Sequence, residues 1–173
     1  MFDPTVYDNL KVGLENHLYD LDNLDEIIHI SNRKDSLEMA SMSREFVLQF
    51  VLREHTEVKG EVILRSSLEA LAAEILETPG SQPGCHLELR FSQETPDLDK
   101  LCPAIRSIMQ VSWPDQRLEQ DIHFVYGEQP VLYNVSSHVY FDRIVNEDQM
   151  GDIPELCEHL VNVLTQLVQL HHV

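Results

Sequence analysis

The stretch IHFVYGEQPVLYNVSSHVYF, residues 122–141, decides the fold class of this chain. Apolar and polar residues alternate on either side of a connection at Gly127–Pro130, which predicts two antiparallel strands joined as a hairpin. The second strand places its apolar residues on one face. On the other side it presents a candidate binding face made of Asn134, Ser136, His138, Tyr140 and Asp142. This pattern predicts an antiparallel sheet with one apolar and one polar face.

Four further segments upstream of the hairpin have strand patterns. The run at 27–30 is short and β-branched, and a polar turn at 32–35 separates it from a predicted strand at 37–43. Residues 45–53 are apolar on one face and half apolar on the other. We therefore expect this strand inside the sheet, with both faces covered. Residues 85–92 alternate cleanly and predict a half-buried strand.

Two helices are expected in the first half of the chain. Apolar residues recur every four positions near the start, which predicts a helix over about 4–19 opened by Asp3–Pro4. Alternation at 10–14 leaves a strand as the competing interpretation. A second amphipathic helix is expected from about Ser66, extended back to Glu61 unless residues 62–64 form a short strand.

A third helix is expected between the strand at 85–92 and the hairpin. Asp97 opens it, and its apolar stripe continues to Met109. Pro103 lies inside the stripe and removes one backbone hydrogen bond, so the helix either kinks or begins there. Pro114 marks its end.

The expected element order is α-β-β-β-α-β-α-β-β-α. Runs of strands separated by single helices predict an α+β fold, with a mainly antiparallel sheet and helices packed on it. At this length we expect residues 1–173 to form a single α+β domain. The loop TPGSQPG at 78–84 is the only candidate for an internal boundary.

The last helix, predicted to begin near Ile153, is unusually apolar. Ten of the eighteen residues from Ile153 to Leu170 are apolar, more than one face of a surface helix needs. We therefore expect a second cover beyond the chain's own sheet, either another helix or a second subunit. The candidate dimer helix is represented by Leu156, Leu160, Val163, Leu164 and Leu167.

The net charge of −18 excludes whole classes of partner. There are 12 basic and 30 acidic residues, Lys11 alone is basic before Arg33, and none is basic after Arg143. Nucleic acids and anionic membranes require basic patches, so we expect neither as a partner. The acidity is typical of a solvated surface, and it leaves a basic protein as a conceivable partner.

Cysteine usage and the N-terminal sequence bear on the compartment. The three cysteines, Cys85, Cys102 and Cys157, form no CxxC pair, which favours free thiols in a reducing environment. The N-terminal residues lack a basic, apolar leader pattern. We therefore expect a cytoplasmic protein.

No motif in the chain indicates catalysis, a cofactor or a metal. The sequence lacks GxSxG, GxGxxG, a P-loop, HExxH and CxxC. His86, His123 and His138 lie on polar strand faces, where their convergence depends on strand order. We therefore expect no cofactor, no metal site and no catalytic residues.

These observations favour a non-enzymatic protein-interaction module that acts as a homodimer. The alternative is a small-molecule-binding protein or an enzyme that uses the polar strand face around His138. In that case His138 is the candidate acid or base. Asp142 lies two strand steps away, too far for a direct hydrogen bond with His138.

Overall fold

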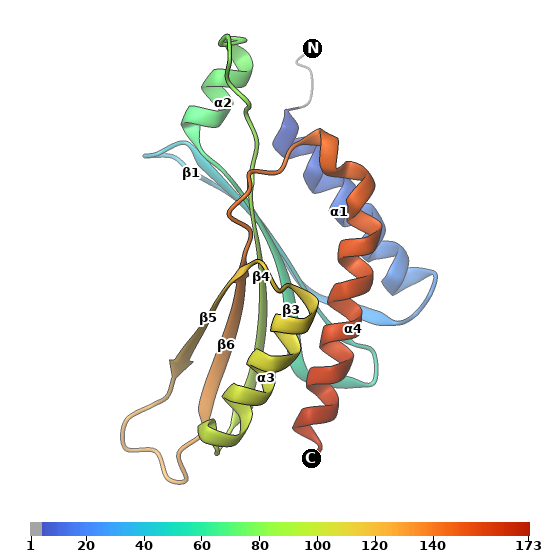
Figure 1. Ribbon diagram of the computed structural model, residues 1–173, viewed down its shortest axis with the longest axis vertical. Coiled ribbons are helices and arrows are strands. Elements are labelled where there is room, and N and C mark those ends of the chain that lie inside the picture. The colour runs from blue at the N-terminus through green and yellow to red at the C-terminus, as the bar shows by residue number, and fades with distance from the viewer. Residues whose placement is uncertain (1–4) are drawn as a thin grey trace.

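The computed structural model describes residues 5–173, which are built around a six-stranded antiparallel sheet (Figure 1). The strands lie in the order β1-β2-β3-β4-β6-β5, so β6 fills the place between β4 and the edge strand β5. Their bounds are β1 Ile28–Glu38, β2 Ser43–Leu52, β3 His55–Ser66, β4 His86–Thr95, β5 Arg117–His123 and β6 Tyr133–Tyr140.

Four α-helices accompany the sheet in the described part of the chain. They are α1 Val6–Asn23, α2 Leu68–Ile75, α3 Leu98–Ser112 and α4 Ile153–His171, and a 3₁₀ helix η1 at Glu147–Asp152 leads into α4. No helix of residues 5–173 combines the length and the apolar character needed to cross a membrane. The α+β class, the antiparallel sheet and the predicted element order are confirmed.

Two alternatives were left open by the sequence: helix or strand at residues 10–14, and a helix that continues through Pro103 or begins there. Residues 10–14 are helical, because α1 is capped by Thr5 and continues to Asn23. The predicted opening at Asp3–Pro4 lies outside the described residues. Pro103 lies within α3, which is assigned as one helix from Leu98 to Ser112.

Both predictions for residues 32–43 are wrong. The predicted turn at 32–35 is the middle of β1, and the predicted strand at 37–43 is largely the turn between β1 and β2. The pairing of β1 with β2 shifts register between Ile30 and Asn32. This irregularity breaks the alternation of apolar and polar residues that would have indicated a strand.

Contacts with α1 explain why such polar residues form a strand. Arg33 Nη2 lies 2.6 Å from Glu15 Oε1, and Asp35 Oδ2 lies 2.8 Å from Lys11 Nζ. Tyr7 also donates its hydroxyl to Asp35. The charged side chains are therefore partnered by the helix that covers them.

Strand boundaries also differ at β3 and β5. The alternative strand at 62–64 belongs to β3, which starts at His55, and α2 begins only after the capping residue Ser67. β5 starts at Arg117 and ends at His123, so residues 124–126 lie in the loop before β6. The strand predicted at 45–53 is interior as expected, but no described helix covers its second face.

Three helices cover one face of the sheet. α4 packs on β2 and β3 and contacts α1 on one side and α3 on the other (Figure 1). The core beneath them includes Phe46, Phe50 and Phe91, which are all at most 2% exposed. Burying each such side chain contributes roughly 1.5–3 kcal/mol.

Gly60 in β3 leaves room for the ring of Phe50 on the neighbouring strand. It lies opposite Phe50 of β2 and Phe91 of β4, and an added Cβ would lie 2.8 Å from the ring of Phe50. Carbon atoms do not approach so closely without displacing the ring, so this position requires glycine.

We predict that Gly60→Ala lowers the free energy of unfolding by about 1–3 kcal/mol, because overpacking displaces a core ring. Urea denaturation followed by Trp113 fluorescence measures this change. Gly151→Ala is the control, because a Cβ at Gly151 meets nothing within 4 Å. Equal stability of the two variants would contradict the role of Gly60.

Candidate functional site

Four of the five residues of the candidate binding face lie on β6 and point to the sheet face opposite the helices. These are Asn134, Ser136, His138 and Tyr140, each on an alternate position of the strand. Asp142 lies beyond the end of β6, where its side chain is 77% exposed and 3.9 Å from Nε of Arg117. The structure therefore separates Asp142 from His138.

His138 is buried beside an equally buried carboxylate on the neighbouring strand. Its Nδ1 lies 2.6 Å from Oε1 of Glu88, and the two side chains are 8% and 4% exposed. The ring of Tyr140 stacks on the imidazole at 5.6 Å. The Nε2 atom lies 3.1 Å from Oδ2 of Asp121, but without the alignment of a hydrogen bond. One buried nitrogen of His138 therefore has no hydrogen-bond partner among residues 5–173.

The Glu88–His138 pair belongs to a network of charges across this face. Basic and acidic residues alternate from strand to strand, so the network runs from β1 through β2, β3 and β4 to His138 of β6. The links are Lys34–Glu45 at 3.2 Å, Glu45–Arg65 at 2.8 Å, Arg65–Glu88 at 2.6 Å, Arg90–Glu88 at 3.6 Å and Arg90–Glu61 at 2.9 Å. Within this network the neighbouring cations lower the pKa values of Glu45 and Glu88 despite their burial.

Glu88 is the most deeply buried acid of the network. Burial by itself raises its pKa, but hydrogen bonds from His138 and Arg65 and the charges of Arg65 and Arg90 outweigh burial. The pKa of Glu88 is therefore held below its ordinary value of 4.5. For Tyr140, burial and the neighbouring carboxylates, Glu88 first among them, raise the pKa of the phenol. Tyr140 thus stays protonated and neutral.

An open hollow of about 650 Å³ adjoins His138. Polar side chains of β4 and β6, namely Ser92, Asn134 and Ser136, line it together with the cations of Lys59 and Arg90. Four carboxylates, those of Glu57, Glu61, Glu94 and Asp121, also line it and outnumber the two cations. The hollow suits a small polar molecule better than an apolar one.

Sequence reasoning missed the residues that make this face a network. Glu88 and Arg90 lie on β4, whose pairing with β6 depends on the sheet order, and Arg65 lies on β3 on the other side of β4. Their alternation within each strand is visible in the sequence, but the register that places Arg90 beside His138 is not. His86 and His123 share the face, yet neither belongs to a metal-ligand cluster within residues 5–173.

The apolar residues of the candidate dimer helix are buried by other parts of their own chain. Leu160, Val163, Leu164 and Leu167 of α4 are all 0% exposed, and Leu156 is half-buried. The second cover that the sequence required is supplied by α1 and α3, which flank α4 on the sheet. These residues are therefore not available to a second subunit, and the apolar excess of α4 does not by itself argue for a dimer.

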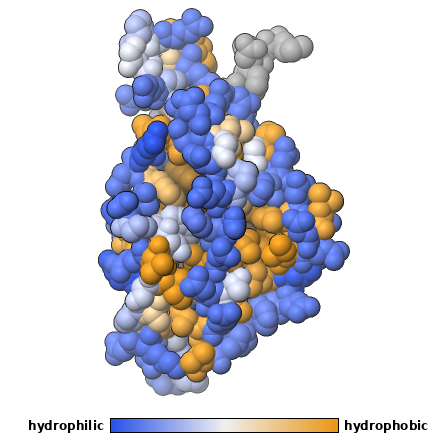
Figure 2. Space-filling model, turned by 45° about the vertical axis from the view of Figure 1, so that its right-hand side comes forward, coloured by the Kyte–Doolittle hydropathy of each residue, from blue (hydrophilic) through white to orange (hydrophobic). Residues whose placement is uncertain are grey.

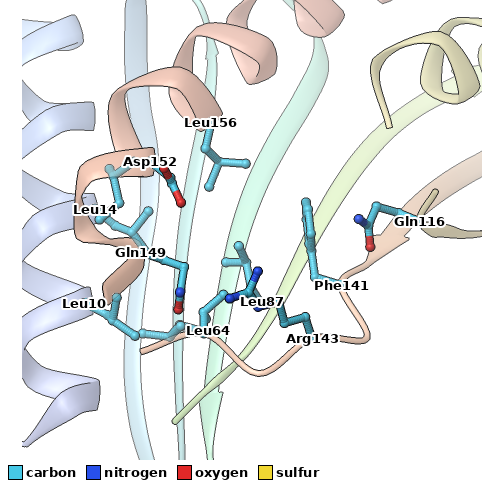
Figure 3. A pocket seen from close by; sticks show the side chains of 12 residues that line it. Leu10, Leu14, Leu64, Leu87, Gln116, Phe141, Arg143, Gln149, Asp152 and Leu156 are labelled. Atoms are coloured by element: carbon cyan, nitrogen blue, oxygen red, sulfur yellow. The ribbon is translucent and has the colours of Figure 1, made fainter. Parts of the chain in front are cut away.

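Leu156 instead lines an apolar cavity of about 220 Å³ between α1, the start of α4 and the sheet (Figure 3). Leu10, Leu14, Leu64 and Leu87 form its walls, and the polar groups of Arg143 and Asp152 lie at its border. A cavity with such walls accepts apolar groups rather than charged ones.

α2 is the one α-helix of residues 5–173 without a buried residue. It projects beyond the end of the sheet, away from the other helices (Figure 1). Its apolar side is wide, and hydrophobic residues reach the surface of this projection (Figure 2). We call this surface the α2 stripe, and it consists of Leu68, Leu71, Ala72, Ile75 and Leu76.

No protein-family model, no curated protein and no solved structure matches this chain.

We predict that Glu88→Gln lowers the free energy of unfolding at pH 7 by about 1.5–3 kcal/mol, the range for hydrogen bonds to charged groups. The pKa of Glu88 is lowered by folding, so its contribution is fully present above the ordinary value of 4.5 and is lost as pH falls through the folded pKa. Urea midpoints between pH 7 and 3 should therefore converge for the two proteins at low pH.

Glu94→Gln is the matched control for this experiment. Glu94 lies on the same strand and the same face but is exposed, and no described cation lies within ion-pair distance of it. Its substitution should leave the midpoint nearly unchanged at every pH. A constant difference between Glu88→Gln and the wild type down to pH 3 would contradict the assignment.

Proposed function

We propose that this chain is a cytoplasmic, non-enzymatic protein-interaction module that acts as a homodimer through the α2 stripe. The observation that supports the proposal is the exposure of this stripe. Leu68, Ile75 and Leu76 are 49%, 68% and 74% exposed, although each is a large aliphatic residue. Isolated exposed leucines are common, but an entire helix with none of its apolar residues buried is not.

The length of α2 makes the exposure informative. Helices much shorter than about 12 residues are marginal in water unless tertiary packing stabilises them. α2 has eight residues and receives little packing from its own chain. A partner that covers the stripe would supply the missing contacts.

A second copy fits the charge of this surface. The chain carries a net charge of −18, so two copies repel each other over most of their surfaces. On α2 the charged residues are Glu69 and Glu74, and Glu74 is turned back to accept a hydrogen bond from the backbone N–H of Val6. Leu68, Ile75 and Leu76 thus offer two acidic copies an apolar surface on which to meet, with the exposed Glu69 and Glu77 at its border.

The turn between β1 and β2 offers further exposed apolar residues near α2. Arg44 at the start of β2 pairs with Ser66, which places the turn between β1 and β2 at the same end of the sheet as α2. Leu37, Met39 and Met42 around this turn are 39–77% exposed. The extension matters because a stable interface buries roughly 1,200 Å² or more in total, which one short helix does not provide.

We predict that the wild-type protein is a dimer of about twice 20.0 kDa. The double variant Ile75→Glu, Leu76→Glu should be monomeric, because a dimer through α2 would desolvate the new charges and place them opposite one another. Light scattering behind a sizing column at ~0.1 mM protein measures the mass, which depends on concentration for a reversible dimer.

Val111→Glu is the control, because Val111 is an 83% exposed aliphatic residue on α3. This variant should remain dimeric. A monomeric wild-type protein at this concentration would refute the homodimer. A dimer that survives the charges on α2 would refute the α2 stripe as its interface.

The acidic surface also suits a basic protein as the partner that the dimer binds.

The alternative proposal is a small-molecule site on the polar sheet face. What favours it is the unpartnered Nε2 of buried His138 beside the hollow at Arg90. Ser136→Trp fills this hollow from β6. Small polar molecules that raise the melting temperature of the wild type but not of Ser136→Trp would support the alternative, and no shift across such a set would contradict it.

A further inference from the structure

Three side chains with metal-ligand chemistry meet where α4 ends beside the turn between β2 and β3 (Figure 1). His55 and Glu57 open β3, and His172 follows α4. Nε2 of His172 lies 2.5 Å from Oε1 of Glu57, and Nδ1 of His55 lies 3.4 Å from the same oxygen. One ligand atom from each residue lies within 4.8 Å of the other two.

These separations suit a shared ion. Zinc bonds of about 2.0–2.2 Å in tetrahedral geometry place neighbouring ligand atoms about 3.3–3.6 Å apart. Small rotations of the exposed His55 and His172 side chains would bring the three atoms to such distances. The histidine rings already lie edge to face with their centroids 5.3 Å apart, so they do not block one another.

Glu57 provides an independent sign that a ligand is missing. Its Oε1 atom is buried but has no aligned hydrogen bond within residues 5–173, despite the two imidazoles beside it. Buried carboxylate oxygens nearly always have a partner. The unpartnered oxygen of Glu57, with an imidazole on either side, therefore offers a ligand atom to a cation.

We propose that His55, Glu57 and His172 bind one Zn²⁺ ion. Two imidazole nitrogens and one carboxylate oxygen favour zinc over magnesium or calcium, which prefer all-oxygen sites. Three protein ligands leave the fourth position to water. The ion ties the end of α4 to the turn between β2 and β3, two segments that lie far apart in the sequence.

The spacing rules used on the sequence could not find this site. They look for ligands a few residues apart, as in HExxH or CxxC. His55 and Glu57 are two residues apart on a strand, where both side chains lie on one face, but the third ligand comes from beyond the last helix. Folding alone brings His172 to them.

Isothermal titration of metal-free full-length protein with Zn²⁺ tests the proposal. We expect one ion per chain for the wild type. Glu57→Gln and His172→Gln should each weaken binding at least about tenfold, because removing a group from a metal site costs that much or more. The Co²⁺-loaded protein should show the visible absorption of a four-coordinate ion.

Two control variants separate this site from other donors. His86→Gln removes an exposed histidine elsewhere, and Cys102→Ser removes the most accessible thiol. Both should bind Zn²⁺ as the wild type does. Circular dichroism shows whether each variant is folded, which is expected because His172 is exposed. No stoichiometric binding by the wild type, or unchanged binding by folded His172→Gln, would overturn the proposal.

Discussion

The burial of α4 is the interaction on which the rest of the structure depends. Its inner face covers β2 and β3, and its sides are closed by α1 and α3. Seven of its residues are buried, including Cys157, whose pKa burial raises to about 12. The main hydrophobic core of the sheet therefore faces one helix layer, and the opposite face carries mostly polar side chains, with the buried Ile63 among them.

The polar face shows how an uncovered sheet can still bury charges. Long side chains from neighbouring strands cover one another, so Glu88 is 3% exposed although no described helix lies above it. Such burial is costly unless every charge is partnered. Arg65, Arg90 and His138 provide the partners, and together they hold the strands in one register.

The sequence predicted the fold class and element order because periodicity is local. Leu10, Leu14 and Leu18 mark α1, and the alternation of β4 marks a strand, whatever the rest of the chain does. β1 was misread because Arg33 and Asp35 are stabilised by α1, a contact that local pattern does not contain. His138 could be predicted as a site residue because it lies in the alternating pattern of its own strand. Its partner Glu88 could not be predicted, because it depends on the register between β4 and β6.

The isolation of α2 has a consequence for when this helix forms. A segment with no buried residue opens with a free energy well below that of global unfolding, so its amide hydrogens exchange quickly in a single chain. Covering it would order the helix and create the interface in one event, with the cost of ordering subtracted from the affinity. Association would then act as a late folding step of this one segment, while the sheet and its three covering helices are complete beforehand.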